Sequence, residues 1–108
     1  MTDGLEWAQV ARLDNLEKGF PEAFGFDGRR IALFRIGGTV YATDDECPHE
    51  QACLSDGYLE GDVVECPLHQ SRFHIPTGEV LSPPATDDLT VYPVKIEDGA
   101  IFVGFKRE

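Results

Sequence analysis

Three cysteines and three histidines are the residues of this 108-residue chain whose types and spacing suit metal chemistry. Cys47-Pro48-His49 places one thiolate and one imidazole a single residue apart, and Cys66-Pro67-Leu68-His69 places a second pair two residues apart. Thiolate sulfur and neutral imidazole nitrogen are borderline-soft donors that suit zinc or an iron–sulfur cluster. Spacing this tight lets one loop deliver both ligands of a pair, so we predict Cys47, His49, Cys66 and His69 as metal ligands.

Two kinds of metal centre compete for these four side chains. Zinc would take all four around one tetrahedral ion. A [2Fe–2S] cluster would place both cysteines on one iron and both histidines on the other, with two sulfides between the irons. Zinc knuckles commonly group two cysteines together, whereas each pair here is mixed, which favours a two-iron cluster held between two loops. On the donor set alone, a zinc-stabilised interaction module stays open as the alternative.

Short strands must position these pairs, because glycines and prolines punctuate the chain and no long helical period is present. Across a two-glycine turn, Arg30–Ile36 and Thr39–Thr43 have the pattern of a β-hairpin. A second hairpin is predicted from Thr90–Ile96 and Ala100–Phe105, joined by a turn of three residues. Pro93 inside its first strand indicates an edge position or a bulge.

The remaining elements are also short. We predict a strand over Leu5–Leu13, one helical turn over Asp14–Gly19 capped by Asp14, and a short strand over Asp62–Cys66. Several short strands of this kind predict an all-β fold, an antiparallel sandwich or small barrel. Residues 44–84, rich in Cys, His, Pro and Gly, are expected to form a loop-rich lobe inserted in the β framework of a single domain over residues 1–108.

The motif and its surroundings resemble a known family. C-P-H and C-P-L-H, with 16 residues between them, are similar to the Rieske signature C-x-H…C-x-x-H. The flanking segment SDGYLEGDVVECPLHQSRFHIPTGEV resembles Rieske ferredoxins of bacterial aromatic-ring-hydroxylating dioxygenase systems, and the similarity covers roughly residues 40 to 105. It implies a Rieske fold with one [2Fe–2S] cluster. It also implies a carrier that moves one electron at a time from a flavin-dependent NAD(P)H reductase to a terminal oxygenase.

By the same resemblance, Cys47 and Cys66 would hold the inner iron, while His49 and His69 would hold the outer, reducible iron. The chain would then be an electron-transfer component and not an enzyme, since it is too short to add a mononuclear iron site. The alternative within the resemblance is a small Rieske-like subunit of a nitrite-reductase-type enzyme.

Three further residues need an interpretation. Cys53 has no partner for the disulfide of high-potential Rieske proteins, because Leu68 follows Pro67, and it is expected to be a small buried filler. Ser71 has two open readings: a surface residue, or a hydroxyl that donates to a cluster sulfide and raises the potential. His74 is expected to be a strand residue and not a ligand.

The net charge of the chain limits the classes of partner that we expect. Twenty acidic residues against nine basic ones give a net charge of −11, which disfavours nucleic acid and anionic membranes. An acidic surface suits docking on a basic patch of another protein. The carboxylates around the first loop, which are Asp44, Asp45, Glu46, Glu50 and Asp56, are therefore expected to form a solvated docking rim.

The odd cysteine count argues against a disulfide framework, and the N-terminus has neither a basic start nor an apolar run. We accordingly expect a cytoplasmic protein, a monomer, whose partners are a flavoprotein reductase and a terminal oxygenase.

Overall fold

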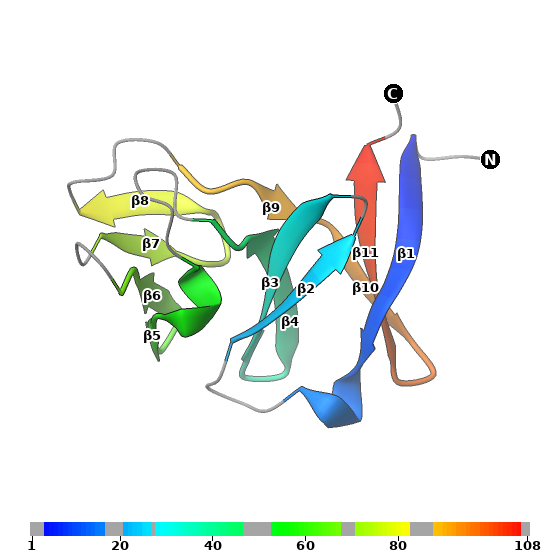
Figure 1. Ribbon diagram of the computed structural model, residues 1–108. Helices are drawn as coiled ribbons and strands as arrows, with labels where there is room; N and C mark the ends of the chain where they lie inside the picture. Colours follow the sequence, from blue (N-terminus) through cyan, green and yellow to red (C-terminus); the bar gives the residue numbers. More distant parts are fainter. Residues whose placement is uncertain are drawn as a thin grey trace.

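The computed structural model describes residues 4–16, 21–26, 28–46, 53–67, 71–82 and 88–106. Within these ranges the regular structure consists of short antiparallel strands and two 3-10 turns (Figure 1). This confirms the predicted all-β class. In the same ranges no helix has the length and apolar character needed to cross a bilayer.

Three sheets follow one another across the molecule (Figure 1). The base sheet, in the order β1-β11-β10, contains β1 (Leu5–Arg12), β11 (Ala100–Lys106) and β10 (Val94–Glu97). The central sheet, in the order β2-β3-β4-β9, contains β2 (Glu22–Phe26), β3 (Arg29–Ile36), β4 (Thr39–Asp44) and β9 (Val91–Tyr92). The lobe sheet, in the order β5-β6-β7-β8, contains β5 (Tyr58–Glu60), β6 (Val63–Glu65), β7 (Arg72–His74) and β8 (Glu79–Ser82).

The first predicted hairpin is confirmed as β3 and β4. Ile36 pairs with Thr39 across the two-glycine turn, and the register continues to Ile31 opposite Asp44. Gly37 has φ +62°, a conformation that suits glycine. The hairpin therefore brings the start of β3 beside the end of β4, the point at which the first predicted ligand loop leaves the sheet.

Strand β3 is buried on both of its faces, and each face packs into a different core. Ile31 and Leu33 belong to the base core, whereas Ala32 and Phe34 belong to the lobe core. Because side chains alternate along a strand, one strand can serve two cores in this way. The base core consists of Leu16, Ile31, Leu33, Val40, Ala42, Ile101, Val103 and Phe105. The lobe core consists of Ala32, Phe34, Leu54, Val64, Cys66, Phe73, Ile75 and Leu89.

The second predicted hairpin differs from expectation at Pro93. The chain changes sheets there: β9 pairs with β4 in the central sheet, while β10 pairs with β11 in the base sheet. Proline has no N–H to donate to a ladder, so it suits the crossing point. The turn has two residues, not three, because Glu97 pairs with Ala100 and both Asp98 and Gly99 have positive φ.

The N-terminal strand is confirmed as β1, followed by η1 (Leu13–Asn15). The prediction that Asp14 caps a helical turn is wrong. Arg12 is the N-cap residue and Asp14 lies inside the turn. Gly19, the predicted end of that turn, lies outside the described residues.

The predicted strand over Asp62–Cys66 is confirmed as β6. Strands β5, of three residues, and β8, of four, go beyond the predicted elements, because such short runs carry little periodicity, whereas β7, of three residues, contains the strand residue predicted at His74. They give the lobe a sheet of its own, so its described part is more regular than the predicted loop-rich segment. The 3-10 turn η2 (Leu54–Asp56) leads into this sheet.

Candidate metal centre

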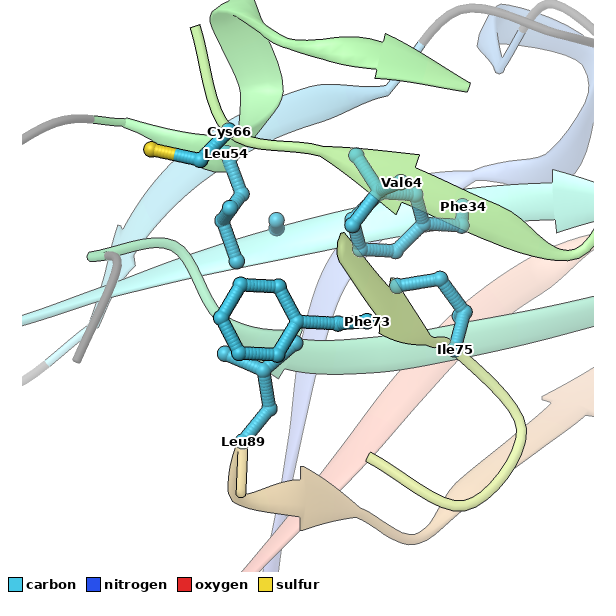
Figure 2. Close-up of a cluster of buried hydrophobic side chains, with 8 residues drawn as sticks. Phe34, Leu54, Val64, Cys66, Phe73, Ile75 and Leu89 are labelled. Carbon is cyan, nitrogen blue, oxygen red and sulfur yellow. The ribbon is translucent and has the colours of Figure 1, made fainter. Parts of the chain in front are cut away.

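Cys66 is the predicted ligand that the structure describes. It follows β6 directly, its side chain is fully buried, and its N–H donates to the carbonyl oxygen of Ser71 at 2.8 Å. This hydrogen bond closes the segment that contains His69. Figure 2 shows the Cys66 sulfur at the margin of the lobe core, directed away from Val64 and the ring of Phe73.

Cys47, His49 and His69 lie outside the described residues, but the ends of the loop that carries the first pair are defined. Glu46 and Cys53 form an antiparallel β-bridge, and the N–H of Leu54 donates to the carbonyl oxygen of Asp45 at 2.6 Å. Each predicted ligand pair therefore lies in a short segment whose two ends are hydrogen-bonded to each other.

The two segments meet through η2. Leu54, the first residue of η2, packs in the lobe core together with Cys66. Gly57, directly after η2, lies so close to β6 that an added Cβ would be 2.2 Å from the carbonyl oxygen of Glu65. Its φ of −85° is ordinary, so close backbone approach, and not conformation, requires glycine at this position.

Asp45 contradicts the predicted solvated rim, because its carboxylate is completely buried. Oδ2 accepts hydrogen bonds from Arg30 Nε at 3.2 Å and Nη2 at 3.1 Å, and Oδ1 accepts one from the N–H of Ser55 at 2.8 Å. The hydrogen bond to Asp45 raises the pKa of the Arg30 guanidinium above its ordinary value. The carboxylate is buried because its oxygens have partners, in line with the general rule for buried charges.

The register of the first hairpin is the signal that could have found this pair. Ile36 opposite Thr39 implies Ile31 opposite Asp44, and one more step places Arg30 beside Asp45. The structure has that contact, since the N–H of Asp45 donates to the carbonyl oxygen of Arg30 at 3.0 Å. A buried acid on a hairpin is thus predictable when a basic residue lies at the matching position of the partner strand.

The other carboxylates of the predicted rim divide into three groups. Asp44 is half-buried and accepts a hydrogen bond from the hydroxyl of Tyr92. Glu46 and Asp56 are exposed, as predicted. Glu50 lies outside the described residues. Among the described residues, the solvated acidic edge of the site is therefore smaller than the sequence indicated.

Cys53 is half-buried, so the prediction of a buried filler is only partly correct. Desolvation raises the pKa of its thiol above the ordinary value, and the negative charge of Asp45 raises it further. The thiol is therefore a poorer thiolate donor than an ordinary cysteine at neutral pH.

Ser71 is 1% exposed, and the reading of a surface serine is wrong. It lies next to β7, at the end of the segment that Cys66 begins. The hypothesis that its hydroxyl tunes a cluster stays a prediction.

His74 is a strand residue of β7, as predicted. Its Nδ1 lies 2.9 Å from Thr77 Oγ1 and its Nε2 lies 3.0 Å from Asp62 Oδ2. Both ring nitrogens thus have partners at the end of β7 that is remote from Ser71. The arrangement supports a structural role for this histidine.

The surroundings of Cys66 suit a [2Fe–2S] cluster better than they suit a solvent-exposed metal site. Cys66 offers a buried thiol at the edge of an apolar core, and an apolar shell of this kind is one of the means by which proteins tune such clusters. The described residues contain no separate group of three or more His, Cys, Asp or Glu side chains that could hold a metal ion.

The chain is similar to known proteins over most of its length. A family model described as the Rieske [2Fe–2S] domain matches residues 6–93. The ferredoxin component of the naphthalene 1,2-dioxygenase/salicylate 5-hydroxylase systems of a Ralstonia species is 47% identical over 92 residues. These residues cover 85% of this chain and 88% of that protein.

Two solved structures are similar over almost their whole length. The ferredoxin in a complex of reduced oxygenase and oxidized ferredoxin of carbazole 1,9a-dioxygenase has a TM-score of 0.88 and 35% identity, covering 94% of this chain and 95% of that one. A protein proposed to be the small subunit of an NADH-dependent nitrite reductase from Mycobacterium tuberculosis has a TM-score of 0.86 and 27% identity, covering 98% of this chain and 100% of that one.

Proposed function

The chain belongs to the Rieske [2Fe–2S] family, and we propose that it carries single electrons to the terminal oxygenase of an aromatic-ring dioxygenase system. Its upstream donor in this proposal is a flavoprotein NAD(P)H reductase. The observation that supports the role most strongly is the 47% identity to a dioxygenase ferredoxin component over 85% of the chain. The carrier is not itself an enzyme: relatives of this kind are named as ferredoxin components.

We infer that Cys47, His49, Cys66 and His69 hold the cluster. When bound, the cluster supplies a one-electron centre with a potential between about −150 and +300 mV. Residues of this chain form the surroundings of the cluster. The lobe core keeps water from the Cys66 side, and the backbone hydrogen bonds at Asp45 and Ser71 close the two ligand segments. We take the chain as one Rieske domain, with residues 44–84 as the cluster-binding lobe.

The negative charge of the chain supports docking on a basic surface of the partner protein. Exposed Glu46 and Asp56 flank the first ligand segment, and the net charge is −11. Acidic carriers of this kind associate faster with basic partners at low ionic strength. A small shuttling carrier has to leave each partner after transfer, so we propose a soluble, cytoplasmic monomer.

Reconstitution tests this function. The purified chain is combined with the reductase and oxygenase of a naphthalene 1,2-dioxygenase system, NADH and naphthalene, and product formation is followed at two salt concentrations. We expect oxygenation to depend on the chain and to fall as salt rises. His69→Ala should abolish it through loss of a ligand, while Cys53→Ser should retain it. The proposal would be contradicted if the reduced chain delivered electrons to the oxygenase no faster than it reacts with dioxygen.

The alternative, a small subunit of a nitrite-reductase-type enzyme, is supported by the structural similarity at 27% identity. It predicts a stable complex with a large catalytic subunit and no electron delivery to a dioxygenase. Reconstitution therefore separates the two functions.

A further inference from the structure

The buried carboxylate of Asp45 connects three segments of the chain. Its Oδ2 binds the guanidinium of Arg30 at the start of β3, and its Oδ1 binds the N–H of Ser55 in η2. Its own N–H and carbonyl oxygen bind Arg30 and Leu54. All backbone and side-chain hydrogen-bonding groups of Asp45 are thus paired, although the residue stands at a strand end where a solvated acid would be expected.

These bonds hold the two ends of the first ligand segment together. Asp45 stands before the first ligand segment, and it accepts hydrogen bonds from the two consecutive amides that follow this segment, Leu54 and Ser55. Cys47 lies two residues beyond Asp45 in the sequence, so Asp45 anchors the start of the segment that carries the first ligand pair.

The constraint continues to the second ligand segment. The turn η2, held by Asp45 at Leu54 and Ser55, is followed by Gly57, which lies against the carbonyl oxygen of Glu65. Cys66 is the next residue. A continuous series of contacts therefore runs from Arg30 through Asp45 and η2 to the strand end that carries Cys66.

We propose that Asp45, oriented by Arg30, is a positioning residue that sets the first ligand pair relative to the second. The inference rests on the ligand set given under the proposed function. It assigns a role to a carboxylate that binds no metal itself and acts through η2.

A purely stabilising role would predict a different outcome. The Arg30 side chain is 62% exposed and its guanidinium stays hydrated when the pair is broken, but the carboxylate is fully buried, so its removal also costs the fold stability, which a thermal control has to match. The amide of Ser55, by contrast, has its bond to Asp45 inside the lobe, next to the ligand segment. Loss of the carboxylate should therefore affect the site more than it affects the fold as a whole.

The experiment compares iron release to a chelator, visible circular dichroism and hydrogen exchange of the peptide over residues 53–57 in the loaded protein. For Asp45→Ala we expect iron release and exchange to rise about tenfold, with an altered dichroism spectrum. Asp45→Asn and Arg30→Met, which remove the ion pair but spare the Ser55 acceptor, should lie between Asp45→Ala and wild type. Arg30→Lys, which keeps the positive charge, should lie closer to wild type than Arg30→Met does.

Two controls make the test specific. Val103→Ala removes two methyl groups from the base core and destabilises the fold remote from the site. Asp14→Asn disrupts an exposed ion pair with Arg12 and should change nothing. The positioning role is overturned by wild-type iron release in Asp45→Ala, or by equal release in Asp45→Ala and Val103→Ala at equal loss of thermal stability. A wild-type protein without iron would instead contradict the proposed function.

Discussion

Ser71 gives a prediction about the midpoint potential of the cluster. Its carbonyl oxygen closes the segment begun by Cys66, and its side chain is buried. This hydrogen bond is accepted by the backbone of Ser71, so Ser71→Gly should keep it. If the hydroxyl donates to a cluster sulfide, the variant should lower the midpoint potential by roughly 40 mV, the one-electron equivalent of about 1 kcal/mol. Spectroelectrochemical titration of both proteins checks this, and identical midpoints would refute the tuning hypothesis.

Cys53 gives a prediction about pH. Desolvation and the charge of Asp45 raise the pKa of its thiol, so the reactive thiolate forms only at higher pH than in an ordinary cysteine. In the loaded protein we expect alkylation by iodoacetamide to be slower than that of free cysteine at pH 8, with a rate that still rises above pH 9. Cys53→Ser should abolish this labelling and keep the cluster. Labelling at the rate of free cysteine, with the cluster intact, would show that the thiol is not shielded.

At the residue scale, the sequence predicts donors better than it predicts their surroundings. The spacing of Cys47, His49, Cys66 and His69 indicates a metal centre without any knowledge of the fold. The burial of Asp45 depends on Arg30, which lies 15 positions away in the chain, and only the hairpin register relates the two. The burial of Ser71 depends on the short strands of the lobe, which are too short to show a clear alternation of apolar and polar residues.

At the element scale, β3 and η2 position the site. Strand β3 contributes Phe34 to the lobe core and Leu33 to the base core, so the lobe and the base share one rigid strand. The sequence RIALFRI predicts a strand, but its apolar residues do not alternate, which is typical of burial on both faces. Pro93 predicts a disturbance of its strand, but the change of sheet that it allows depends on pairings distant in sequence, which no local pattern predicts.

Gly57 allows a prediction at this scale. In Gly57→Ala the new methyl group would meet the carbonyl oxygen of Glu65, and backbone has to shift because no flexible side chain can yield. We expect a loss of about 1–3 kcal/mol in the free energy of unfolding, together with lower cluster occupancy. Gly38→Ala is the matched control, since nothing lies within 4 Å of a Cβ there. Denaturant unfolding and iron analysis of both variants give the answer, and equal stability of the two would mean that η2 does not pack tightly on β6.

At the scale of the whole molecule, the lobe sheet and the base sheet lie on opposite sides of the central sheet (Figure 1). Leu5 pairs with Lys106 in the base sheet, whereas Cys66 directly follows β6 of the lobe sheet. The lobe can therefore approach a partner without involving the base. The net charge of −11 is a property of the same scale and was readable from composition, whereas the arrangement of three sheets around β3 required the structure.

The most direct test of the mixed cysteine and histidine cluster is a reductive titration of the purified protein followed by electron paramagnetic resonance. We predict two irons per chain and a rhombic signal of the mixed-ligand type, which appears on reduction in the lower part of the range from about −150 to +300 mV. A colourless protein that stays silent on reduction and contains zinc would contradict the account.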